Sequence, residues 1–142
     1  MSYAVATPSA DHFRQPRTRR LGVVATAAII TSLAWLAGHL AGVDYLVVTP
    51  LSARPITLGL VAAGTAAAGS AGWALLVFLE RHTRRARVIW TALALAVLTS
   101  SLVPIFVFPA DAPTRVTLGV LHCLAAAILI PGLRHAGLRH TR

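Results

Sequence analysis

Four long apolar segments, separated by short polar connections, constrain this sequence more than any other feature. They cover approximately residues 21–43, 55–79, 88–108 and 116–133. As α-helices, the first would span about 33 Å and the shortest about 27 Å, whereas the hydrocarbon core of a bilayer is about 30 Å thick. Because lipid offers no partners to backbone polar groups, each segment must form a helix there. The pattern predicts an all-α integral membrane four-helix bundle with antiparallel, up-down topology.

Composition agrees with lipid as the solvent. The chain is 56% hydrophobic and only 12% charged, whereas soluble domains are about a quarter charged. A soluble fold would leave much of the apolar surface exposed. The net charge of +9 comes from thirteen arginines against four acids. Since these arginines lie between or outside the apolar segments, without interleaved aromatic residues, they indicate membrane topology and no nucleic-acid partner.

The distribution of arginines predicts the orientation. The N-terminal tail, the second connection and the C-terminal tail hold four, four and three arginines, whereas the first and third connections hold only Arg54 and Arg115. This bias places both termini in the cytoplasm. The arginine-only, alanine-rich composition resembles that of a high-GC bacterial genome, which predicts the plasma membrane as the location. Residues 1–20 and 134–142 are expected to be basic cytoplasmic tails, the first of them flexible.

The first apolar segment follows a basic stretch, so a cleaved signal peptide is an alternative. The segment is about twice as long as a typical signal core, and no small-x-small cleavage site closes it. We therefore expect residues 21–43 to remain as a membrane anchor.

Several local features refine the expected helices. Residues 43–54 should form a turn-rich linker, with Pro55 in the first turn of the next helix. Residues 62–72 of that helix, AAGTAAAGSAG, are small on every face, which predicts a helix enclosed by its neighbours. Gly38-x-x-x-Gly42 matches the motif of helix dimers, although such matches often arise by chance.

The third predicted helix carries two markers. Trp90 has the position of an interfacial aromatic residue, and Pro104 should kink or end the helix. In the preceding basic turn, Glu80 is spaced to pair with Arg84 across one helical turn.

His39 and His122 are the ionisable residues within the apolar segments, where such groups are costly and therefore candidates for function. They should lie about 6 and 9 Å inside the same side of the membrane, so we expect them to share a polar pocket. The candidate ligand- or proton-binding residues are His122, His39, Ser100 and Ser101. A structural alternative is an imidazole bonded to a hydroxyl of the 99–101 cluster.

Other chemistry has little support in the sequence. Two histidines without an intramembrane carboxylate predict neither a metal site nor a cofactor, and Cys123 as the single cysteine excludes an intramolecular disulfide. No GxSxG, HExxH or Walker motif is present, so we expect no enzyme. The basic turn should instead contact anionic lipid at the cytoplasmic face, through Arg81, Arg84, Arg85 and Arg87.

Three segments, 72–76 (GWALL), 79–87 (LERHTRRAR) and 121–133 (LHCLAAAILIPGL), resemble a family of small actinobacterial membrane proteins. It is the domain of unknown function sixty sixty-nine. The resemblance covers about residues 17–134 and implies a four-helix membrane protein without an established activity.

Two functional hypotheses follow. The first is a non-enzymatic accessory or interaction subunit that packs with itself, or with a larger membrane complex, through small-residue faces. The alternative is a minimal transporter or proton-coupled carrier that uses His39 and His122. A polar cavity at His122 would favour transport, whereas an exposed small-residue face would favour association.

The topology is testable with reporter fusions. An export-dependent phosphatase fused after Arg142 or within the turn at Arg84 should be inactive, whereas one inserted near Asp44 or Asp111 should be active. Phosphatase activity after Arg142 would contradict the orientation.

Overall fold

The computed structural model describes residues 15–49, 52–107 and 109–136, and it contains four helices and one β-hairpin. The helices are α1 (Gln15–Leu40), α2 (Leu58–His82), α3 (Ala86–Val107) and α4 (Ala112–His135). Strands β1 (Leu46–Thr49) and β2 (Ser52–Pro55) lie between α1 and α2. Each helix is long and apolar enough to cross a membrane, so the predicted fold class is confirmed.

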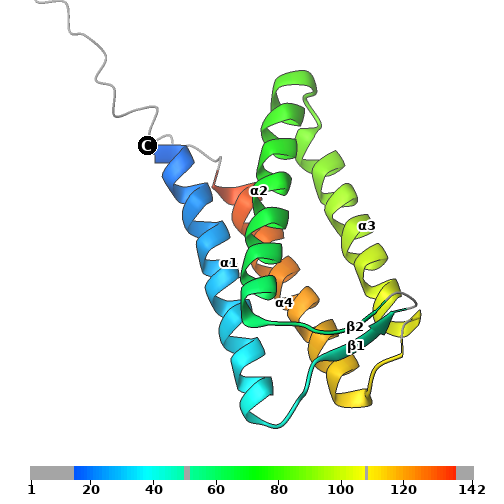
Figure 1. Cartoon of the computed structure of the whole chain (residues 1–142). Helices are drawn as coiled ribbons and strands as arrows, with labels where there is room; N and C mark the ends of the chain where they lie inside the picture. Colours follow the sequence, from blue (N-terminus) through cyan, green and yellow to red (C-terminus); the bar gives the residue numbers. More distant parts are fainter. Residues whose placement is uncertain (1–14, 50–51, 108, 137–142) are drawn as a thin grey trace, which may run out of the picture.

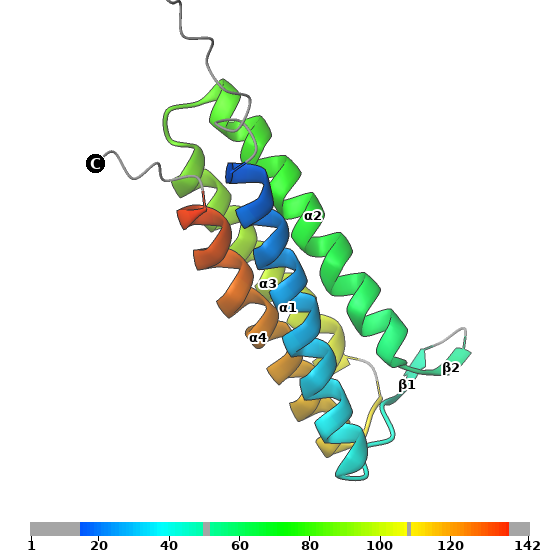
Figure 2. The same cartoon turned by 90° about the vertical axis from the view of Figure 1, so that its left-hand side faces the viewer.

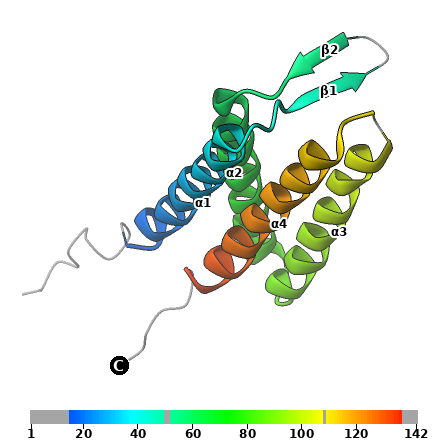
Figure 3. The same cartoon turned by 90° about the horizontal axis from the view of Figure 1, so that it is seen from below.

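The helices form an antiparallel ring in which each packs on the next and α4 closes against α1, while α2 and α4 touch only slightly across the diagonal (Figure 3). Helix α1 begins, and α4 ends, beside the turn between α2 and α3 (Figures 1 and 2). We call this the arginine-rich end. The opposite, hairpin end carries β1, β2 and the connection from α3 to α4.

The helices extend beyond most of the predicted boundaries. The first begins at Gln15, so the predicted tail boundary at residue 20 is wrong, and residues 1–14 lie outside the described part. Pro16 suits a first helical turn, and arginine is a good helix former. At the other end of the chain, α4 continues through Pro131 to His135. Helix α3 likewise continues through Pro104 and ends three residues later, at Val107.

The linker predicted at residues 43–54 is largely an antiparallel hairpin. Leu46 pairs with Pro55 and Val48 with Ala53, and the Val-Val-Thr run of β1 favours a strand. Placing Pro55 in a helix was therefore wrong. Helix α2 begins at Leu58, where the Oγ1 of its N-cap residue Thr57 accepts a hydrogen bond from the Leu60 amide at 3.4 Å.

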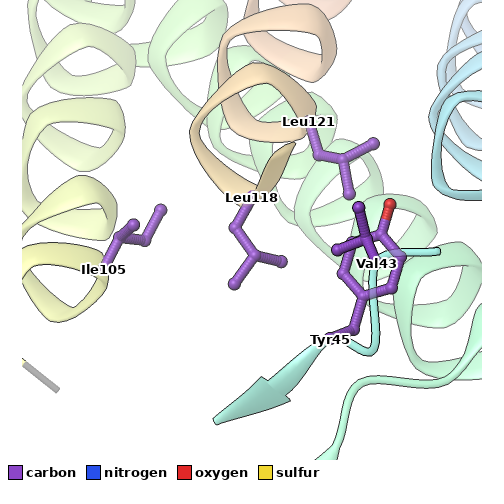
Figure 4. Packing of buried hydrophobic residues seen from close by; sticks show 5 residues of the cluster. All are labelled: Val43, Tyr45, Ile105, Leu118 and Leu121. Atoms are coloured by element: carbon purple, nitrogen blue, oxygen red, sulfur yellow. The ribbon is translucent and has the colours of Figure 1, made fainter. Parts of the chain in front are cut away.

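Tyr45 organises the hairpin end. Its side chain is fully buried in a cluster with Val43 of the same connection, Ile105 of α3, and Leu118 and Leu121 of α4 (Figure 4). Its φ of 52° is unusual for a residue with a side chain. Buried contacts therefore stabilise a backbone conformation that the sequence did not indicate.

One hydrogen bond and one close contact join Tyr45 to α1. Its hydroxyl donates to the carbonyl oxygen of Trp35 at 3.0 Å, and it lies against Gly38, where a Cβ atom would collide with it. Gly42 lies beyond the helix at φ +88°. Gly38 thus allows a close contact within the chain, and Gly42 allows a turn with positive φ, so both glycines of the Gly38-x-x-x-Gly42 pattern have a role in this fold.

A second cluster lies toward the arginine-rich end and contains Leu76, Trp90 and Leu133. Trp90 is 3% exposed, and its indole Nε1 donates to the carbonyl oxygen of Gly72 at 2.7 Å. Helical carbonyls have a second lone pair for such a bond. The prediction of Trp90 as an interfacial residue is therefore wrong, because the indole finds its polar partner inside the bundle.

Helix α2 is not the most enclosed helix. Along it only Gly69 and Leu76 are buried, and α1 and α4 bury a larger share of their length. Helix α2 packs mainly on α1 and α3 and leaves its remaining side uncovered. A Cβ atom on Gly69 would lie 3.0 Å from Val24 and 3.1 Å from Leu129, whereas one on Gly64 would meet nothing within 4 Å.

The two glycines give a matched test of this packing. Gly69→Leu should destabilise the fold by about 1–3 kcal/mol through overpacking against α1 and α4. Gly64→Leu should melt like the wild type, because its side chain enters open space. Thermal denaturation in mild detergent compares them, and equal melting temperatures would contradict the described helix arrangement.

Candidate functional site

The two histidines of the predicted site make separate contacts. His39 is exposed and stacks on Trp35, with ring centroids 5.1 Å apart and an interplanar angle of 12°. His122 is half-buried, and its Nδ1 lies 2.8 Å from the carbonyl oxygen of Leu118, one turn earlier in α4. In the described residues the two histidines share no hydrogen bond or ring contact. Each histidine instead makes a contact on its own helix, and the common pocket stays a prediction.

The hydroxyl cluster on α3 is also satisfied locally. Thr99 Oγ1 donates to the Leu95 carbonyl at 3.0 Å, and Ser101 Oγ donates to the Leu98 carbonyl at 2.7 Å, while Ser100 is exposed. The predicted bond between His122 and this cluster is replaced by the bond within α4. Because a carbonyl only accepts, Nδ1 of His122 carries the proton.

The arginine-rich end contains an ion pair that the sequence reading missed. Arg20 of α1 is 6% exposed, and one of its terminal nitrogens, Nη2, donates to both carboxylate oxygens of Glu80 in α2, at 2.9 and 3.0 Å. The pair joins two helices near their ends. The predicted partner of Glu80, Arg84, lies in the turn beyond the end of α2, so the one-turn spacing on which that prediction depended does not exist.

The same end gathers arginines and almost no acid. The predicted lipid contacts Arg81, Arg84 and Arg85 are exposed and Arg87 is half-buried. Among the described residues here, the single carboxylate is Glu80, and Arg20 already neutralises it. The remaining arginines therefore present a strongly cationic surface.

A groove of about 480 Å³ runs between α1 and α4 from this end. Its open space lies beside Gly22, where a Cβ atom would meet nothing within 4 Å. Deeper packing comes from Val23, whose side chain fills the position that a Cβ atom on Gly132 would take. The groove is lined by Arg19, Gly22, Val23, Thr26, Ile128, Gly132, His135 and Ala136. The sequence carried no signal for it, because its walls belong to the first and last helices.

Comparison with protein families agrees with this description. The model of a family described as a family of unknown function, DUF6069, matches residues 12–139. The chain belongs to this family. The resemblance seen in the sequence is thereby confirmed. This member of the family is a multi-pass, four-helix membrane protein. Neither a curated protein nor a solved structure matches the chain.

The Arg20–Glu80 pair predicts a stability change. Glu80→Gln removes the carboxylate and leaves Arg20 buried, which should cost about 1.5–3 kcal/mol. Arg84→Gln should have little effect, because that side chain is exposed. The double variant Arg20→Met with Glu80→Leu should recover most of the loss, because no unpaired charge remains buried.

Thermal melting of the full-length protein in detergent measures all three variants. If Glu80→Gln melts at the temperature of Arg84→Gln, the ion pair does not stabilise the contact between α1 and α2.

Proposed function

We propose that this protein is a non-enzymatic accessory or interaction subunit of the plasma membrane, with both termini in the cytoplasm. Eleven of its thirteen arginines lie in residues 1–20, 81–87 and 134–142, which supports this orientation. The bundle associates with a second copy of the chain, or with a larger membrane complex, through one side of α2.

The observation that carries this proposal is the exposed small-residue face of α2. It consists of Gly64, Ala67, Ala68 and Ala71, all of them exposed. Steps of three and four residues place them on one side of the helix. Small side chains gain little from lipid tails, but they allow another helix to approach closely and gain van der Waals contact.

The chain's own packing shows why this face is left over. Gly69, on another side of α2, already receives Val24 of α1 and Leu129 of α4. Gly64 receives no neighbour within 4 Å of its missing Cβ. A small-residue surface that the chain does not cover itself is suited to a partner helix.

The same observations lend less support to transport. The groove lies between other parts of α1 and α4, and neither His39 nor His122 lines it. Each histidine instead makes a contact on its own helix. Association therefore explains more of the structure than a proton-coupled path does.

Energy transfer between labelled copies of the full-length protein in lipid vesicles tests the proposal. The wild type should show transfer above the level of random proximity, and Gly64→Leu and Ala68→Leu should reduce it several-fold by keeping the partner helix apart. Ala96→Leu is the matched control, since Ala96 is an exposed alanine on α3 and should leave transfer unchanged.

Random transfer in the wild type would exclude self-association. Association with a different subunit would then require Gly64→Leu, but not Ala96→Leu, to lose that subunit in copurification. If neither variant changes transfer or copurification, this face of α2 is not an interface.

A further inference from the structure

The groove between α1 and α4 has an arrangement that neither the fold nor the proposed association explains. Two ionisable side chains, Arg19 and His135, stand at its rim, and small and apolar residues line its interior. We propose that it binds one anionic phospholipid, with the phosphate at Arg19 and His135 and an acyl chain beside Gly22, Thr26 and Ile128. This binding does not depend on association through α2.

The depth of the groove matches this ligand. From Arg19 to Thr26 on α1, and from Ile128 to His135 on α4, the lining extends over seven residue steps, which is about 10 Å along each helix axis. The two helices are antiparallel (Figure 2), so Arg19 and His135 lie at the same end and the deeper residues at the same depth. A soluble anion would use only the rim, whereas a phospholipid has a charged group and a chain at these two levels.

Glycine makes the space for the chain. An added Cβ on Gly22 meets nothing within 4 Å. Because Gly132 has no side chain, Val23 occupies the place that a Cβ atom would take, and α1 and α4 can pack closely there. A volume of about 480 Å³ lies within the roughly 300–1,000 Å³ of small-molecule sites. The open space at Gly22 therefore has walls on both helices and an apolar interior.

Charge selects an anionic headgroup. Glu80, the single described carboxylate at this end, is held by Arg20 and does not neutralise Arg19. On the α4 side, Nδ1 of His135 lies 2.7 Å from the Pro131 carbonyl oxygen, so it donates there and the ring is oriented. The ring's Nε2 is therefore left for a ligand at the rim of the groove. Basic pockets between membrane helices at a cationic face are suited to such headgroups.

This site differs from general attraction by Arg81, Arg84, Arg85 and Arg87. Attraction by exposed arginines depends on charge and needs no pocket. Binding of an acyl chain in the groove depends in addition on the open space there, so a side chain that occupies this space should weaken lipid binding. A neutral substitution that occupies the space at Gly22 therefore separates the two explanations.

Native mass spectrometry of the full-length protein in mild detergent tests the site, with phosphatidylglycerol and phosphatidylcholine of identical acyl chains as probes. The wild type should retain one phosphatidylglycerol in preference to phosphatidylcholine. Arg19→Gln should weaken this binding about fivefold, the weight of one cationic group near an anionic headgroup. Gly22→Leu, which leaves every charge in place, should weaken it at least as much.

The controls lie at the hairpin end. Arg54→Gln removes an exposed arginine there, and Gly59→Leu fills open space at an exposed glycine of α2; both should bind like the wild type. Gly64→Leu should also bind normally, so a failure of the proposed association is distinguished from a failure of the lipid site. Thr26→Phe gives a second way to fill the groove if Gly22→Leu melts at a lower temperature than Gly59→Leu.

Equal retention of the two lipids by the wild type would overturn the proposal. So would normal phosphatidylglycerol binding by folded Gly22→Leu or Thr26→Phe, because binding would then depend on surface charge alone.

Discussion

The structure depends on one constraint, that backbone polar groups in hydrocarbon must find partners within the chain. Four apolar segments satisfy it as helices, and polar side chains along these helices also find partners within the chain. Thr31, Thr99 and His122 each bond a carbonyl of their own helix. Trp90 reaches across to a carbonyl of α2. Polar groups that look like a reactive cluster in the sequence thus each have a hydrogen-bond partner on their own helix.

The two ends of the bundle are closed by different interactions. At the hairpin end, Tyr45 is buried between α1 and α4, and the hairpin is tied to the next connection by a bond from the Val48 amide to the Pro109 carbonyl at 3.2 Å. Burial raises the pKa of the Tyr45 phenol above its ordinary value, and the hydrogen bond with Thr117 lowers it in part. The phenol donates its proton to the carbonyl oxygen of Trp35 in α1. At the arginine-rich end, the Arg20–Glu80 pair joins α1 to α2.

The division of surfaces supports the two proposals separately. Helix α2 uses one side within the bundle, at Gly69, and leaves Gly64 and its neighbours uncovered for another helix. The first and last helices leave a groove at the end where arginines gather. The proposed association face and the proposed lipid site can therefore coexist. The first lies on α2, the second lies between α1 and α4, and they require different side chains.

The sequence by itself determined the helix number, the membrane solvent and the family, because apolar length and the segments around residues 72–90 and 121–133 are local properties. It also identified His39, His122 and the basic turn as candidates. Only the tertiary structure decided which glycines pack, that Trp90 is buried, that Glu80 pairs with Arg20, and that an open groove lies between α1 and α4. These features join residues far apart in the chain. Periodicity describes one helix at a time, and which faces meet depends on how all four helices close into a ring.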